Sequence, residues 1–167
     1  MAKVITFSRK YPAYHPRKGE PTFFVEKILH CLPCIQTVNI EQLVYDCDVE
    51  LEDNYEPKGH TIRKGKRWKT GDLASLRFWS DKRYNSPQVI FSVDLPIRVF
   101  DVEMCLDFFN LYLRIEGKEY VHHIHSVFAE LAKNDGLSTD DFNSWFGDKP
   151  FSGQIICWDE SIKYPPF

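Results

Sequence analysis

The chain has 167 residues and a net charge of −3, and 43% of its residues are hydrophobic and 15% aromatic. This composition excludes an intrinsically disordered chain, and the pI near 6.1 argues against a surface that binds polyanions indiscriminately. No signal-like segment and no apolar run of roughly 18 residues occurs, so we expect a cytoplasmic protein of one domain, residues 1–167, with no membrane contact.

The first third of the chain predicts a strand, a helix and an insertion. Residues 4–9 (VITFSR) alternate in polarity and predict a strand, which a loop rich in turn residues follows. Thr22 is a candidate N-cap for a helix of about three turns that ends at Pro33. Residues 33–57 mix acids with short apolar pieces, and we interpret them as an acidic insertion with one or two short elements.

The middle of the chain predicts a cluster of strands. The segments HTIR (60–63) and LASLRFWS (73–80) predict two strands, and the turn between them carries two glycines. Residues 89–120 predict two or three further strands, with Pro96 at an edge or a bulge.

The last third predicts two helices and a closing strand. Apolar residues recur with the helical period over residues 121–136. A second, short helix follows, because Ser138 and Asp141 form the N-cap and N3 positions of a capping box. Residues 153–164 (GQIICWDESIKY) predict a buried closing strand.

These elements sum to six or seven strands and three helices. The strands are concentrated between residues 60 and 120, and the helix pair precedes the last strand. The sequence therefore predicts an α+β fold, a small and mostly antiparallel β-barrel with about three helices packed outside it.

Charges are sorted sharply along the chain. The segment from Lys58 to Asp72 holds six lysines and arginines and no acid before its last residue, whereas the segment from 41 to 56 holds seven acids and no base. Trp68 lies among the cations, next to Arg67 and two positions after Lys66. An aromatic ring between cations suits stacking on a nucleobase while the cations hold phosphates.

Four segments, in chain order, resemble the ASCH family, a branch of the PUA-like barrels. They are ITFSR with the helix TFFVEKI, then KGHTIRKGKRWKTGD, then LAKNDGLSTDDFNSWF, and last GQIICWDESIKY. The second segment resembles the family's Lys-x-x-Thr-x-Arg strand with its Gly-Asp turn. The resemblance covers most of the chain except the insertion, and it implies a barrel with a cleft that binds RNA or nucleotides.

One bacterial branch of this family consists of N4-acetylcytidine amidohydrolases. Carried over residue by residue, the resemblance places the catalytic lysine at Lys58, the threonine at Thr61 and the acid at Asp135, with Arg63 as the arginine of the motif. In such a site the lysine acts as base, the threonine attacks a carbonyl or positions water, and the carboxylate orients the lysine or takes a proton. The acid is an aspartate here, one methylene shorter than the family's glutamate.

Further aromatic and basic residues are candidates for the rim of this cleft. Arg9 and Tyr11 would reach it if the first strand lay beside the 60–63 strand, and Arg83 and Tyr84 form a similar loop. The predicted ligand-binding residues are Arg63, Arg9, Tyr11, Lys66, Arg67 and Trp68.

Two patterns could indicate a metal or redox site. Cys31 and Cys34 form a CxxC pair, but no second ligand pair follows at zinc-binding spacing, and no βαβ pattern surrounds it. His122 and His125 would share one face of a helix, without an indicated carboxylate partner. We therefore predict no metal and no cofactor.

The sequence thus favours binding of RNA, a nucleotide or a modified nucleoside in a basic cleft. Two alternatives stay open. One is an amidohydrolase acting on N4-acetylcytidine or a related N-acylated nucleoside through Lys58, Thr61 and Asp135. The other is a protein-interaction module whose partner contacts residues 41–56.

Overall fold

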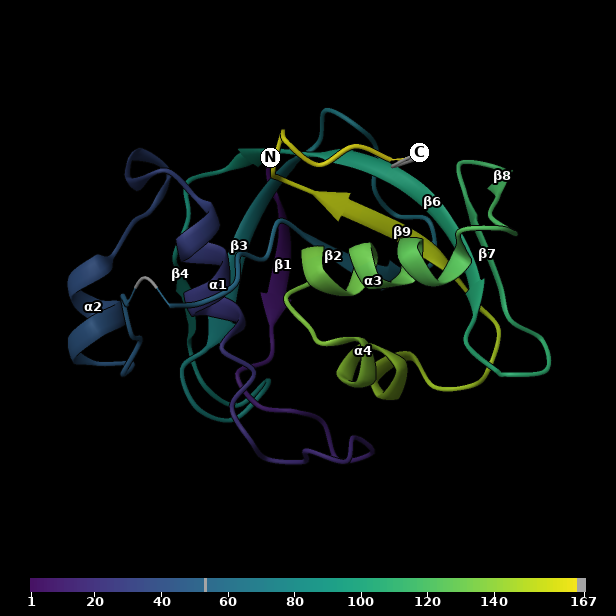
Figure 1. The fold of residues 1–167 in the computed structure, drawn as a ribbon. Coiled ribbons are helices and arrows are strands. Elements are labelled where there is room, and N and C mark those ends of the chain that lie inside the picture. The colour runs from purple at the N-terminus through teal and green to yellow at the C-terminus, as the bar shows by residue number, and fades with distance from the viewer. Residues whose placement is uncertain (53, 165–167) are drawn as a thin grey trace. The chain divides into compact units, whose positions relative to one another are not determined.

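The computed structural model describes residues 1–52 and 54–164. The described residues form four α-helices and nine strands in two mostly antiparallel sheets, which confirms the predicted α+β class. The chain divides into two compact units (Figure 1). Unit 1 comprises Met1–Lys58 and Gly71–Ile97, and unit 2 comprises Gly59–Thr70 and Arg98–Phe167. Each unit contains one sheet, and closure of strands into a barrel remains a prediction.

Unit 1 is built on a four-stranded sheet. Its strands are β1 (Lys3–Phe7), β3 (Leu73–Trp79), β4 (Gln88–Ile90) and β5 (Leu95–Pro96). β1 runs parallel to β3, and β4 and β5 pair antiparallel with β3. The condition under which Arg9 and Tyr11 would rim the cleft, a first strand paired with the 60–63 strand, is therefore not met. β1 and β3 pair because both bury large apolar side chains in this unit, among them Phe7 and Phe78.

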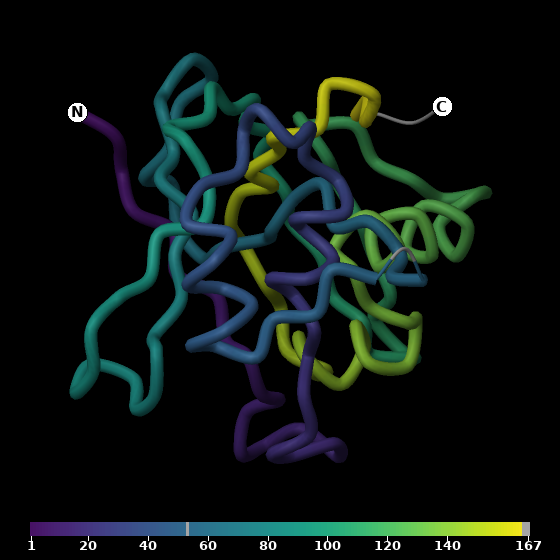
Figure 2. Tube along the Cα trace, turned by 90° about the vertical axis from the view of Figure 1, so that its left-hand side faces the viewer, coloured from purple at the N-terminus to yellow at the C-terminus, as the bar shows by residue number. Residues whose placement is uncertain are grey.

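Helix α1 (Phe24–Cys31) follows a long loop that extends from the end of β1, drawn in purple in Figure 2. The helix is confirmed, but its cap differs from the prediction. The N-cap is Phe23 in a left-handed conformation, with φ 56°. The Thr22 hydroxyl instead donates to the Ser8 carbonyl at 2.7 Å and accepts from the Phe24 amide at 3.3 Å, so it ties the loop to the helix start.

The acidic insertion forms two short elements, as predicted, within unit 1. They are the 3₁₀ helix η1 (Cys34–Gln36) and the helix α2 (Ile40–Tyr45). Leu43 of α2 is fully buried, and the Val38 amide donates to the Phe91 carbonyl at 3.2 Å. The insertion is therefore anchored to the core of unit 1 by both apolar packing and backbone bonds.

Unit 2 is built on a five-stranded antiparallel sheet in the order β2-β9-β6-β7-β8. Its strands are β2 (His60–Lys64), β6 (Arg98–Cys105), β7 (Tyr112–Ile115), β8 (Lys118–Glu119) and β9 (Phe151–Cys157). The helices are α3 (Ile124–Asn134) and α4 (Thr139–Phe146). Figures 1 and 2 show both helices on one side of this sheet. β2 is an edge strand and pairs with β9 alone.

Local sequence signals explain both helices of unit 2. Val127 and Leu131 of α3 are fully buried, as the helical period predicts. Ser138 caps α4, because its hydroxyl oxygen accepts from the Asp141 amide at 3.1 Å.

No helix in the described part of the chain combines the length and the apolar character that a membrane crossing requires.

Residues 89–120 contain more strands than the two or three predicted. Pro96 lies in the short strand β5 at the edge of the sheet in unit 1. Glu116 and Gly117 both have positive φ angles, of 49° and 77°, and so form the tight turn that joins β7 to β8.

The closing strand ends earlier than predicted, at Cys157, although Trp158 is buried as expected.

Candidate functional site

Polar side chains are buried in a short run at the start of β2. Lys58, His60 and Thr61 are only 1%, 0% and 6% exposed. Lysine, histidine and threonine are seldom buried to this degree, and burial costs free energy unless each polar group finds a partner. This run of buried polar side chains at the edge of a sheet is therefore the first candidate for a functional site.

The pairing of β2 with β9 divides these residues between two faces of the sheet. Thr61 lies opposite Ile156 and Arg63 lies opposite Gln154, whereas His60 lies opposite Cys157. Cross-strand partners share a face and successive residues alternate. Thr61 and Arg63 therefore lie on one face, called here the Thr61 face, and His60 lies on the other, called the His60 face.

On the Thr61 face, Gln154 holds the turn that follows β2. Its side chain is 5% exposed. The amide oxygen accepts from the Trp68 backbone N–H at 3.0 Å, and the amide nitrogen donates to the Trp68 carbonyl at 3.1 Å. The same nitrogen donates to the Asp101 carboxylate at 3.2 Å. This buried amide therefore clamps the middle of the turn onto the sheet.

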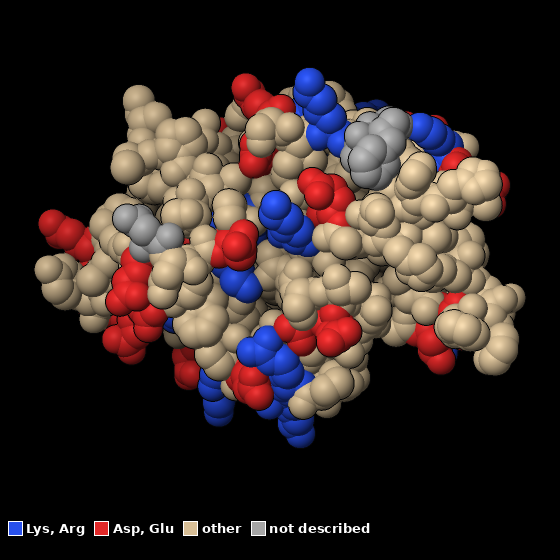
Figure 3. Space-filling model, viewed as in Figure 1, with Lys and Arg blue, Asp and Glu red and all other residues tan. Residues whose placement is uncertain are grey.

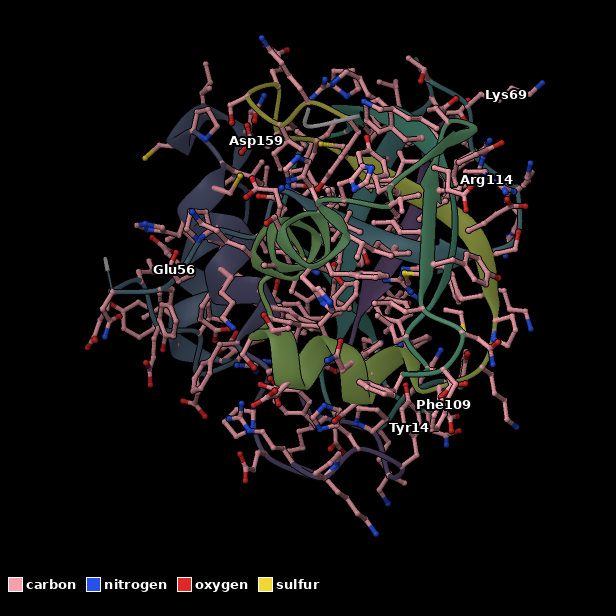
Figure 4. All side chains as sticks on the ribbon, turned by 45° about the vertical axis from the view of Figure 1, so that its right-hand side comes forward. Tyr14, Glu56, Lys69, Phe109, Arg114 and Asp159 are labelled. Carbon is pink, nitrogen blue, oxygen red and sulfur yellow. The ribbon has the colours of Figure 1, made fainter. Side chains whose placement is uncertain are left out.

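The clamped turn carries the cations that the sequence singled out. We call residues 64–69 the basic loop. Its four cations are exposed and Trp68 is half-buried; the cations are Lys64, Lys66, Arg67 and Lys69. Figure 4 shows Lys69 extending away from the protein. The loop thus presents charge to solvent around a ring that is partly held against the protein.

Lys66 has a defined partner on β6. Its ammonium donates to the Asp101 carboxylate at 2.8 Å. This hydrogen bond raises the pKa of Lys66 and lowers the pKa of Asp101. Both groups therefore stay charged, and Asp101 offsets the Lys66 charge, whereas Lys64 makes no ion pair with any residue that the structure describes.

Thr61 and Arg63 complete the Thr61 face. Thr61 is buried, and its hydroxyl makes no hydrogen bond within residues 1–52 and 54–164. The Arg63 side chain is half-buried. A hydroxyl, a guanidinium, an aromatic ring and exposed cations therefore belong to one strand and the turn that follows it.

The His60 face holds a different set of polar groups. His60 Nε2 lies 2.8 Å from the Tyr164 hydroxyl, and His60 Nδ1 lies 3.7 Å from the Asp135 carboxylate. Asp135 directly follows α3, where the positive φ of Gly136 (73°) ends the helix. The Gly59 amide donates to the Asn134 carbonyl at 3.0 Å, which ties the start of β2 to the end of α3.

Burial controls the ionisation of the other groups on the His60 face. Burial raises the pKa of the Tyr164 hydroxyl well above its usual value. Burial likewise raises the pKa of the Cys157 thiol to about 11, although Arg98 opposes the shift. Both groups therefore keep their protons at neutral pH, and Cys157 is not a thiolate nucleophile.

Asp135 is thus placed beside His60. The face alternation of β2 puts Thr61 on the opposite face of this strand from His60. Lys58 belongs to unit 1, where its ammonium lies 4.4 Å from the Phe24 ring centroid. Such an arrangement is a cation–π contact. The catalytic roles of these three residues remain predictions.

Arg9 and Tyr11 are both engaged within unit 1. The Arg9 guanidinium donates to the Cys47 carbonyl and to the buried Glu26 carboxylate, and so fastens the insertion to the unit. Tyr11 is 4% exposed, and its ring lies beneath the Arg17 guanidinium at 4.7 Å. These contacts give both side chains a structural role, and contact with a ligand remains a prediction for them.

The insertion presents an acidic surface. Figure 3 shows acidic side chains gathered over α2 and the segment that follows it. Six of these carboxylates are exposed, and none forms an ion pair with a described residue: Glu41, Asp46, Asp48, Glu50, Glu52 and Glu56. Ile35, Tyr45 and Leu51 lie among them and are 87%, 81% and 50% exposed.

The CxxC pair and the two histidines that the sequence offered as metal ligands are not joined by a third ligand among the described residues. His122 precedes α3, whereas His125 lies within it, so the prediction that they share one helix face is wrong. The helix begins later than the period suggested. Cys31 ends α1 and Cys34 begins η1. Within the described ranges, no group of three or more His, Cys, Asp or Glu side chains is arranged to hold a metal ion.

Three residues of the site were not predicted. His60 lies inside the segment KGHTIRKGKRWKTGD, which the sequence analysis singled out for its other residues. Gln154 interrupts an apolar strand, which also marks a buried polar group that needs partners. Tyr164 carried no signal that separates it from other tyrosines.

Comparison with known proteins identifies no relative of this chain. No model of a protein family, no curated protein and no solved structure matches the chain. The likeness to the ASCH family therefore depends on the four segments alone.

The Gln154 clamp predicts a measurable loss when it is removed. Gln154→Leu keeps the side-chain size but removes the hydrogen bonds to Trp68 and Asp101, so we expect a loss of about 1–3 kcal/mol in the free energy of unfolding. Urea unfolding measures this loss, and amide hydrogen exchange at Trp68 should accelerate. Gln88→Leu is the control, because Gln88 is half-buried and accepts from Arg77 at 3.3 Å. Equal stability of the Gln154 variant and the wild type, with Trp68 exchange unchanged, would contradict the clamp.

Proposed function

We propose that this protein binds RNA, a nucleotide or a modified nucleoside, and that the Thr61 face of unit 2 is the contact surface. The observation that carries the proposal is the clamp of Gln154 on both backbone groups of Trp68. A loop fixed in this way loses little conformational freedom when a ligand binds, and its cations and ring are presented together. We further propose that the strands close into an ASCH/PUA-like barrel in a cytoplasmic protein.

The residues of this face divide by chemistry. Arg67 and Lys69 attract phosphates, and Trp68 stacks on a base. Arg63 donates in pairs to a phosphate or to a base edge, and the Thr61 hydroxyl bonds to a base or a ribose. The Lys66 ammonium must leave Asp101 before it can contact a phosphate.

Binding of this kind depends on a few cations in a chain of net negative charge. The affinity for single-stranded RNA is therefore modest and falls as salt is added, because each phosphate contact releases a counterion. A broadly basic protein would make many more phosphate contacts, and its affinity for RNA would fall much more steeply as salt is added.

Replacing Arg67 and Lys69 together by Ala should weaken binding of a short single-stranded RNA about tenfold. The slope of log affinity against log salt should fall by about one to two. Fluorescence anisotropy at several salt concentrations measures both quantities. The control replaces Lys149 and Lys163, two exposed lysines of unit 2 outside the basic loop. The proposal fails if the control variant loses as much affinity, or if binding does not respond to salt.

An amidohydrolase is the second candidate. The Thr61 hydroxyl favours it, because it makes no hydrogen bond to a described residue and so can contact a substrate. In this reaction the bond between N4 and the acetyl carbonyl breaks, water supplies OH to the acetyl group, and its remaining proton goes to the amine. The products are acetate and cytidine. Thr61 would attack the carbonyl or position the water, with Lys58 as base and Asp135 as its partner.

The wild-type protein should then release acetate from N4-acetylcytidine. Thr61→Val removes the hydroxyl at nearly constant volume, and Lys58→Ala removes the amine, so each should lower kcat/KM at least about a hundredfold. Chromatography of the nucleoside product measures the rate. Thr139→Val, on the exposed first turn of α4, should leave the rate unchanged. Full activity of the Thr61→Val variant would rule out the proposed role of the hydroxyl.

A protein partner is the third candidate, favoured by the exposed apolar side chains among unpaired acids on the insertion. The partner that fits this surface is a basic protein segment with apolar side chains. Replacing Tyr45 and Leu51 together by Ser should abolish binding of such a partner in a pull-down with purified proteins. The matched control replaces Phe108 and Phe109, which are 89% and 87% exposed in unit 2. Equal losses in the two variants would contradict a contact at the insertion.

A further inference from the structure

One face of the sheet in unit 1 is open to solvent and carries an arginine. Arg77 of β3 lies opposite Ile90 of β4, and Trp79 lies opposite Gln88, so these four residues share a face. Phe78, which points to the other face, is 0% exposed and belongs to the core, whereas Ile90 is 36% exposed. The face that holds Arg77 and Trp79, called here the Arg77 face, is therefore the outer face of the sheet.

Arg77 is held on this face by neutral groups. Its Nε donates to the Ser75 hydroxyl at 3.0 Å, and its Nη1 donates to the side-chain oxygen of Gln88 at 3.3 Å. It forms no ion pair with a residue of the described ranges. Its Nη2 makes no hydrogen bond there and is not among the buried nitrogens that lack a partner, so Nη2 reaches solvent. The fixed guanidinium therefore presents donors to an anion from outside the chain.

The loop of unit 1 that joins β3 to β4 adds an exposed aromatic ring. Its charged residues are Lys82, Arg83 and Asp81, and neither cation forms an ion pair with a described residue. The centroid of the Tyr84 ring lies 5.4 Å from that of Trp79 and 4.9 Å from the guanidinium carbon of Arg83. Tyr84 is nevertheless 72% exposed. The loop thus places a ring and two unpaired cations next to the Arg77 face.

Tyr84 has a backbone conformation that suits glycine. Its φ is 65°, in the left-handed region, where a bulky side chain costs free energy. The Asn85 amide donates to the Lys82 carbonyl at 3.0 Å and closes the turn around Tyr84, and the Ser86 hydroxyl donates to the same carbonyl at 2.8 Å. The loop therefore holds a large ring where glycine would fit better. A strained position of this kind points to a use for the ring.

We propose that the Arg77 face and the loop of residues 80–87 form a second contact surface for single-stranded RNA. Arg77 and Arg83 donate to phosphates, and the Tyr84 ring stacks on a base with Trp79 as its support. Arg77 and Trp79 are two positions apart, about 7 Å along the strand, so both groups meet one short stretch of RNA. An anionic membrane fits the loop less well, because the loop has no Phe, Leu or Trp to insert into lipid.

The inference takes its ligand, single-stranded RNA, from the proposed function, but it concerns a different surface. One NMR titration with a short RNA separates the two. The Arg77 Nε–H and the Trp79 indole N–H report on unit 1, and the amides of residues 64–69 report on the basic loop. We expect both sets of signals to shift. Shifts at the basic loop alone overturn the inference and leave the proposed function standing. Shifts at Arg77 and Trp79 alone do the reverse, and an absence of shifts overturns both.

Arg77→Gln tests the phosphate contact, because it removes the charge and keeps a polar side chain. It should weaken RNA binding about threefold to tenfold and lower the slope of log affinity against log salt by about one. Fluorescence anisotropy at several salt concentrations measures both. Lys149→Gln is the control, since it removes one exposed charge from unit 2. Equal losses in the two variants overturn the role of Arg77.

Tyr84→Gly separates binding from folding. It removes the ring and relieves the left-handed backbone, so the midpoint of urea unfolding should not fall, whereas RNA affinity should drop at least about fivefold. Asp48→Gly is the matched control, because Asp48 of unit 1 also has a positive φ, of 52°, and its loss should not weaken binding. Unchanged RNA affinity in Tyr84→Gly overturns the inference. So does binding to vesicles of anionic phospholipid that Tyr84→Gly abolishes while RNA binding is kept, which would identify a membrane surface instead.

Discussion

The register between β2 and β9 determines which polar groups of unit 2 can act together. Because Arg63 lies opposite Gln154, the residue that clamps the basic loop shares a face with Thr61 and Arg63. A shift of one residue would reverse both faces and would place Gln154 on the side of His60. β9 is buried on both faces, because the successive residues Ile155 and Ile156 are both 0% exposed.

Two kinds of polar burial coexist around β2 and β9. Gln154 is fully engaged with backbone and carboxylate partners, so its burial supports the loop. His60 Nε2 lies 2.8 Å from the Tyr164 hydroxyl, whereas His60 Nδ1 lies 3.7 Å from the Asp135 carboxylate and makes no hydrogen bond among the described residues. Thr61 differs, because the residue is 6% exposed and its hydroxyl makes no hydrogen bond among the described residues.

Sequence reasoning succeeded where the signal was local. The capping box at Ser138 and the apolar period of residues 121–136 predicted α4 and α3, because both depend on residues within a few positions. It failed where partners lie far apart in the chain. Tyr164 is 104 positions from His60, and Gln154 is 86 positions from Trp68, so no local pattern could reveal these contacts. The parallel pairing of β1 with β3 was missed for the same reason.

The central claim is that the Thr61 face, with its clamped basic loop, contacts a nucleic-acid ligand. The most direct measurement is an NMR titration of the labelled protein with a short single-stranded RNA. We expect the largest shifts at the Trp68 indole, the Arg63 guanidinium and the amides of residues 64–69. Shifts confined to residues of unit 1, with the basic loop unchanged at saturating RNA, would contradict the account.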